Sequence, residues 1–167
     1  MSFTIYQATV PPMRHTLGNL AQLLAKAEAH CTARKIDPQA LLGARLFPDM
    51  FPLTRQVQIA TDAAKGAAAR LAGIENPRFE DNEASFADLQ ARVAKTIAFL
   101  DSVRPEQFEG AETRHISIPL RDRTVEFAGA QFLTQWAQPN FFFHVTTAYA
   151  LLRHNGVEVG KRDYLGG

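Results

Sequence analysis

The chain has 167 residues, of which 46% are hydrophobic and 21% are charged. This size and composition are typical of one globular domain with its own core, and they exclude a disordered or fibrous chain. The formal net charge is only +1 and no basic stripe stands out, so neither nucleic acid nor an anionic membrane is an expected partner.

The first predicted helix covers about residues 5–33. Its apolar residues recur at spacings of four, three and four, at Met13, Leu17, Leu20 and Leu24. Pro11 and Pro12 lie near its start, where a missing N–H costs least, or else they break the chain before the main helix.

A connector over 35–47 leads to the second predicted helix. Leu41 and Leu42 within it are expected to form a short turn that covers one end of the core. The second helix should begin near Asp49, which is placed to cap it, with Pro52 in its first turn. Its apolar face is mostly alanine, which allows a neighbouring helix to approach closely, and Gly73 ends it.

The third helix is predicted between about Asn82 and Val103. Ser85 and Asp88 have the spacing of a capping box near its start. The stripe that follows consists of Phe86, Leu89, Val93, Ile97 and Leu100.

Residues 115–120 and 124–127 then alternate as short strands do, which predicts a small β-hairpin. The fourth helix begins near Ala130 or, after a break at Pro139, at Asn140. Asn155 and Gly156 end it, since both tolerate a left-handed cap. The polar tail at 161–164 is expected on the surface or against a partner.

Together these elements predict an all-α four-helix bundle, with a short β-hairpin between helices three and four, in a single domain over 1–167. The long link between helices three and four argues against a simple up-down-up-down series.

Several stretches resemble an uncharacterised bacterial family, a domain of unknown function placed within the DinB-like superfamily of four-helix bundles and metalloenzymes. The most specific stretches are 139–144 and 153–156. The others are 48–53, 55–57, Phe79, Phe86 and 89–92. The resemblance covers nearly the whole chain and implies a DinB-like bundle, but its nearest relatives imply no particular reaction.

The wider DinB-like group commonly binds a divalent metal through three histidines, one on the second helix and an H-x-x-x-H pair on the fourth. Here His144 falls at the second position of that pair, but Asn140 takes the first, and the second helix has no histidine. Amide side chains are poor ligands for zinc or nickel. We therefore expect no cofactor and no metal, with His144 as the only ligand if such an ion is bound.

Four residues are candidates for a ligand pocket: His144, Asn140, Gln56 and Arg55. One interpretation of His144 is a core-edge histidine hydrogen-bonded to Asn140 or Gln56. The other is a pocket residue that orients a polar ligand or acts as a general base. Aromatic residues are denser around Trp136 and 141–143 than one helix face can bury, so some of them could line a pocket or a dimer contact.

These features favour a small-molecule-binding or stress-related protein without the three-histidine site. The alternatives are a metal-dependent DinB-like enzyme acting on a thiol-containing small molecule, and a structural dimeric bundle with no ligand. A homodimer is expected from the aromatic surplus and the polar tail. The single cysteine, the absence of a signal-peptide pattern and the lack of a membrane-length apolar run lead us to expect a cytoplasmic protein.

Overall fold

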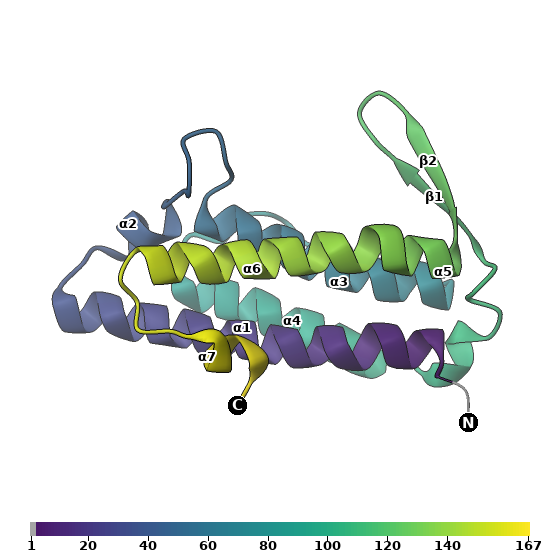
Figure 1. Ribbon diagram of the computed structural model, residues 1–167, viewed down its shortest axis with the longest axis horizontal. Coiled ribbons are helices and arrows are strands. Elements are labelled where there is room, and N and C mark those ends of the chain that lie inside the picture. The colour runs from purple at the N-terminus through teal and green to yellow at the C-terminus, as the bar shows by residue number, and fades with distance from the viewer. Residues whose placement is uncertain (1–2) are drawn as a thin grey trace.

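The computed structural model describes residues 3–167. Four long helices lie side by side and form the body of the molecule (Figure 1): α1 (Ile5–Arg34), α3 (Leu53–Ala72), α4 (Phe86–Ser102) and α6 (Gln138–His154). The shorter elements are α2 (Pro38–Leu42), the 3-10 turn η1 (Pro105–Phe108), β1 (His115–Pro119), β2 (Thr124–Ala128), α5 (Gly129–Gln131), the π-helical segment η2 (Phe132–Ala137) and α7 (Lys161–Leu165). The predicted all-α bundle with a hairpin between the third and fourth long helices is confirmed.

The helices do not follow an up-down-up-down order. In Figure 1, α1 and α6 run in one direction, while α3 and α4 both run in the other. The connector 73–85 therefore returns along the length of the bundle before α4 begins. Side chains mark the neighbouring pairs: Gln90 of α4 donates to the Ala21 carbonyl of α1 at 2.8 Å.

Both prolines of α1 lie inside an unbroken helix, so of the two alternatives the break before the main helix does not occur. A proline at position 12 leaves the carbonyl of Ala8 without its usual N–H donor. The Gln138 amide Nε2 of α6 donates to that carbonyl at 3.0 Å. The helix tolerates Pro12 because a residue far along the chain supplies the missing hydrogen bond.

The start of α3 differs from the prediction. Asp49 does not cap this helix; the N-cap is Pro52, with extended backbone and no side-chain cap. The N–H of Leu53 donates instead to the carbonyl of Ala44 at 3.0 Å. Since the loop before Pro52 supplies this acceptor, Asp49 stays outside the helix.

The start of α4 is later than predicted, at Phe86 rather than Asn82. Ser85 is the N-cap and accepts from the Asp88 N–H at 3.1 Å, while the Asp88 carboxylate accepts from the Ala84 N–H at 3.0 Å. The capping prediction is thus correct for Ser85, and the Asp88 carboxylate binds the N–H of the residue before it.

Leu41 and Leu42 form the expected short turn, and both are buried.

The β1 and β2 strands pair antiparallel, with Ser117 opposite Glu126. After the hairpin, helical structure runs from Gly129 to His154, with Pro139 inside it. The first predicted alternative, a start near Ala130, is therefore confirmed, and the helical structure passes through a π-helical segment instead of breaking at Pro139. Asn155 and Gly156 end α6 as predicted, and Gly156 has φ +86°.

The four long helices share one core to which the short elements also contribute. Its largest fully buried side chains include Phe86, Phe132 and Phe141. The polar tail forms α7, which lies on the outside of α1: the Asn19 amide Nδ2 donates to the Tyr164 carbonyl at 3.0 Å. The surface placement of this tail agrees with the prediction.

Candidate functional site

A pocket of about 200 Å³ lies between α3, α6 and the hairpin. We call it the α3–α6 pocket. Its apolar walls come from Ile59, Ala63, Ala67, Ile118, Phe132, Trp136 and Ala137, and its polar groups are Asp62, Arg70 and Asn140. An apolar cavity with a few convergent polar groups is the usual form of a small-molecule site, although this one is smaller than most sites for drug-sized ligands.

Local sequence explains how the pocket forms. On α3, lining residues recur at helical spacing, and Ala63 and Ala67 leave room where a larger side chain would fill the space. On the other wall, the Phe127 ring of β2 packs against Trp136, with the ring centroids 5.8 Å apart. The hairpin therefore holds the pocket's only tryptophan in place from outside the bundle.

His144 lies one helical turn beyond Asn140 on α6 and is buried. Its Nδ1 is 2.7 Å from Oε1 of Gln56. The orientation of the Gln56 amide is fixed by its nitrogen, because Nε2 donates to the Phe51 carbonyl at 3.1 Å. An amide oxygen can only accept, so Nδ1 of His144 carries the proton and donates.

Burial lowers the pKa of His144 below its ordinary value of 6.5, and the positive charge of Arg55 lowers it further. The ring is consequently neutral at pH 7, and its Nε2 nitrogen holds a lone pair. No hydrogen bond to this nitrogen is found within residues 3–167. Its chemistry is that of an acceptor or a weak base.

The four predicted pocket residues are only partly brought together. Gln56 and His144 are in direct contact, as one interpretation of the sequence expected. Arg55 forms an ion pair with Asp81 and donates to Gln58 at 3.2 Å, so its guanidinium is engaged with polar groups beside the bundle. Asn140 lines the α3–α6 pocket, whereas the other three do not.

The residues around His144 do not fit a three-histidine metal centre. Gln56 is the α3 side chain that faces His144, and it already accepts the Nδ1 proton. The residue one turn earlier is Asn140, whose amide is a poor ligand for zinc or nickel. Over residues 3–167, no group of three or more histidine, cysteine, aspartate or glutamate side chains is placed to hold one ion.

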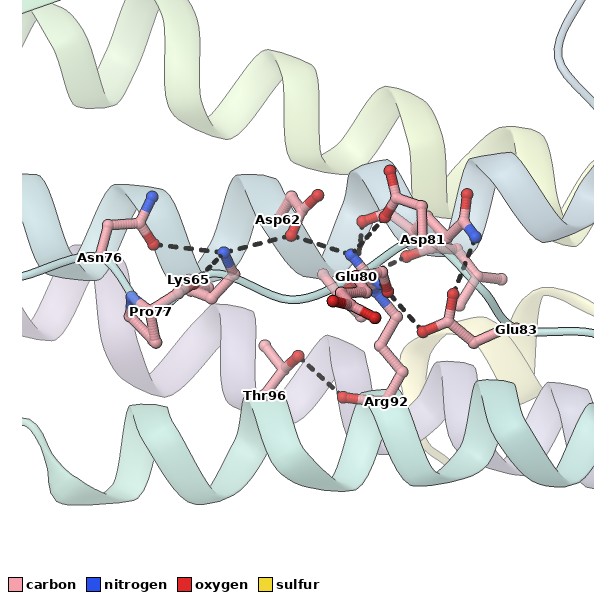
Figure 2. Close-up of polar contacts among 12 residues, drawn as sticks. Asp62, Lys65, Asn76, Pro77, Glu80, Asp81, Glu83, Arg92 and Thr96 are labelled. Carbon is pink, nitrogen blue, oxygen red and sulfur yellow. Dashed lines mark hydrogen bonds and ion pairs between the residues drawn. The ribbon is translucent and has the colours of Figure 1, made fainter.

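Sequence reasoning missed a cluster of charged side chains next to the α3–α6 pocket, in which two cations and one carboxylate are buried and the two other carboxylates are partly exposed. We call it the charge cluster, and Figure 2 shows its members: Asp62, Lys65, Asp81, Glu83 and Arg92. Arg92 is only 3% exposed, and its guanidinium lies 2.9 Å from Glu83 and 3.0 Å from both Asp62 and Asp81.

The charge cluster fixes the 73–85 connector against α3 and α4. Arg92 donates to the Glu80 carbonyl at 2.9 Å, and Lys65 donates to the Pro77 carbonyl at 2.6 Å. The Phe79 ring also lies 4.8 Å from the Lys65 ammonium, within cation–π distance. One signal was available in the sequence: Arg92 falls on the apolar stripe of α4, between Leu89 and Thr96.

Arg70 was also missed. It is half-buried at the C-terminal end of α3, and burial lowers the pKa of its guanidinium. Within the described part of the chain, no hydrogen bond or ion pair of this side chain is found. Gly66, one turn earlier, makes room for it, since a Cβ at that position would overlap the Arg70 guanidinium.

The aromatic residues that the sequence placed around Trp136 and 141–143 line two separate hollows. Trp136 lines the α3–α6 pocket, and Phe142 and Phe143 line a separate apolar groove with Leu46 and Met50.

Cys31 is buried, and burial raises the pKa of its thiol, which disfavours the reactive thiolate. Within residues 3–167, no helix combines the length and apolar character needed to cross a membrane.

Comparisons with known proteins agree with the fold and the resemblance. The family model described as Domain of unknown function (DUF1993) matches residues 5–165. A solved structure described as a DinB family member protein from Shewanella denitrificans is 43% identical, with a TM-score of 0.92, and the match covers 98% of this chain and 92% of that one. No curated protein matches this chain.

Proposed function

The chain belongs to the family described as Domain of unknown function (DUF1993), and on that premise we propose that it binds a small, partly apolar molecule in the α3–α6 pocket. The observation that carries this proposal is the combination of apolar walls with three polar side chains that converge from two helices, Asp62, Arg70 and Asn140.

The chemistry of the site suits binding better than catalysis. Asn140 offers a neutral amide that can both donate to and accept from a ligand. The neutral imidazole of His144 lies one turn away, outside the pocket, and is hydrogen-bonded to Gln56. A divalent-metal enzyme acting on a thiol is the alternative that the DinB-like resemblance implies, and the side chains around His144 do not favour it.

Trp136 gives a direct test, because it is the chain's single tryptophan and it lines the pocket. Neutral probes such as cyclohexanol and cyclohexylacetamide should change its fluorescence in a saturable way and raise the melting temperature, as any ligand specific for the folded state does. The probes do not absorb where tryptophan is excited.

A filled pocket provides the matched comparison. Ala63→Leu should abolish the fluorescence change, because the added side chain occupies the cavity. Ala94→Leu makes the same change on the exposed side of α4 and should leave binding intact. If no probe alters the Trp136 emission, or if Ala63→Leu binds as well as the parent protein, the proposal is wrong.

Metal analysis separates this proposal from the enzyme alternative. We expect the purified protein to contain no stoichiometric zinc or nickel, and chelation by EDTA to leave the melting temperature unchanged. Stoichiometric metal that is lost in His144→Ala would instead support the enzyme.

A further inference from the structure

The α3–α6 pocket shares two of its polar lining residues with a second cavity. This second cavity has a volume of about 320 Å³ and lies over the connector. Asp62 and Arg70 line both cavities. They form a ridge with an apolar cavity on one side and a polar one on the other.

The two sides differ in charge. The second cavity is lined by Lys65, Arg70 and Arg78, with Asp62 as its single carboxylate. Lys65 is already paired with Asp62 at 3.2 Å and with the Pro77 carbonyl. Asp62 is in turn held by Arg92. Arg92 also faces Asp81 and Glu83, and Asp81 pairs in addition with Arg55. The three carboxylates of this cluster are thus matched by three cations, which leaves the charge of Arg70 uncompensated.

Arg70 is suited to hold an anion. A guanidinium offers several N–H donors in a plane and forms paired hydrogen bonds with carboxylate or phosphate. Its half-buried position weakens competition from water, and the same burial lowers the pKa of the guanidinium. The space over Gly66 lets the side chain lie along α3, at the boundary between the two cavities.

From this arrangement we propose that the bound molecule is an anion with an apolar body. The body occupies the α3–α6 pocket, and a carboxylate or phosphate group is bound by Arg70 on the ridge. This inference rests on the proposed function and names the chemical class of the ligand.

The test compares probes of matched shape and different charge. Cyclohexylacetate and its neutral amide differ only in the terminal group, and cyclohexyl phosphate presents the other anion. With Trp136 fluorescence as the readout, the anions should bind about 10- to 100-fold more tightly than the amide, as expected for a charged hydrogen bond. The stronger of the two anions identifies which group the site prefers.

Arg70→Met should weaken the binding of the anions at least about 10-fold more than that of the amide, and Arg70→Lys should retain part of the preference for anions. Arg153→Met, at an exposed position near the end of α6, is the control and should behave as the parent protein. Raising the salt from about 50 mM to about 500 mM should weaken anion binding but not amide binding, which tests the same point without a variant.

The outcomes distinguish the two proposals. If the amide binds as well as the anions, or if Arg70→Met keeps the preference, the anion assignment is overturned while the pocket proposal survives. If neither charged nor neutral probes affect Trp136, both are overturned. Circular dichroism of each variant shows whether the fold is retained, and the salt series decides the matter if Arg70→Met does not fold.

Discussion

Arg92 has more charged neighbours than any other side chain described for residues 3–167. Its guanidinium is almost fully buried and faces three carboxylates, of which Glu83 is itself only 8% exposed. Burying such groups is costly, and removing one partner leaves the others buried without compensation. The connector 73–85 depends on this arrangement, since Arg92 also holds the Glu80 carbonyl.

Arg92→Met should lower the free energy of unfolding by about 3 kcal/mol, because Glu83 then remains buried without its cation. Urea denaturation provides the measurement. Arg104→Met, at an exposed position just beyond α4, is the matched control and should change stability by less than about 0.5 kcal/mol. Equal effects for both variants would contradict a special role for the charge cluster.

His144 gives the protein a dependence on pH. Its pKa is lowered in the folded state by burial and by Arg55, so the unfolded chain takes up this proton more readily. Stability from this residue is therefore complete above its ordinary pKa of 6.5 and decreases as the pH falls below that value toward the lowered one.

We expect His144→Gln to reduce the loss of stability between about pH 8 and about pH 5.5, since glutamine does not titrate but can still donate to Gln56. Melting temperatures across this range provide the measurement. His154→Gln, at the exposed end of the same helix, should keep the parental slope. An unchanged slope in His144→Gln would show that other groups cause the dependence.

At the scale of elements, two backbone segments approach each other closely at the junction between the hairpin and the last helix. Gly129 opens α5 directly after β2, and a Cβ there would overlap the carbonyl of Ala111. The next residue, Ala130, donates its N–H to the Glu112 carbonyl at 3.0 Å. Close approach of two backbone segments, rather than an unusual dihedral angle, requires glycine here.

Gly129→Ala should therefore destabilise the protein by about 2 kcal/mol, because backbone must move to admit the methyl group. Gly18→Ala provides a comparison of opposite sign. Apart from the neighbouring backbone of α1 itself, nothing lies within 4 Å of a Cβ at Gly18, so alanine should stabilise the helix by about 0.5–1 kcal/mol. Thermal or urea unfolding measures both, and two changes of the same sign would contradict this account.

At the scale of the whole molecule, the exposed apolar side chains are unevenly distributed. Four of the six large ones, Leu46, Phe47, Phe51 and Phe143, come from the loop before α3 and from α6. Leu46 and Phe143 line the same apolar groove. In Figure 1 this loop projects from the bundle on the same side as the hairpin, at the other end of α6. An apolar patch of this kind commonly marks a contact surface.

We propose that a second copy of the chain covers this groove, which gives the expected homodimer a location. Sedimentation at micromolar concentration should show a dimer, and the double variant Leu46→Ser with Phe143→Ser, which changes two residues of the groove, should be a monomer. Leu165→Ser changes an equally exposed apolar residue at the end of α7 and should leave the dimer intact. A monomeric parent protein would refute this proposal.

The sequence by itself determined the helices, their apolar stripes, the Ser85 cap, the hairpin and the glycine stop after α6. These features depend on residues a few positions apart, so their spacing is visible in the chain. The expectation that a three-histidine set is incomplete also rests on the sequence, since it needs only the identity of residues at known helical spacing. The sequence also named two possible hydrogen-bond partners for His144, Asn140 and Gln56, and the structure shows that it is Gln56.

The tertiary structure alone decided the rest, because the deciding contacts join distant segments. Pro12 stays within α1 since Gln138 serves the Ala8 carbonyl, and Asp49 loses the α3 cap since Ala44 accepts from Leu53. The pocket itself arises only where α3, α6 and the hairpin meet. Periodicity indicates which face of a helix is buried, but not which helix covers it or where the fit leaves space, and the candidate site depends on both.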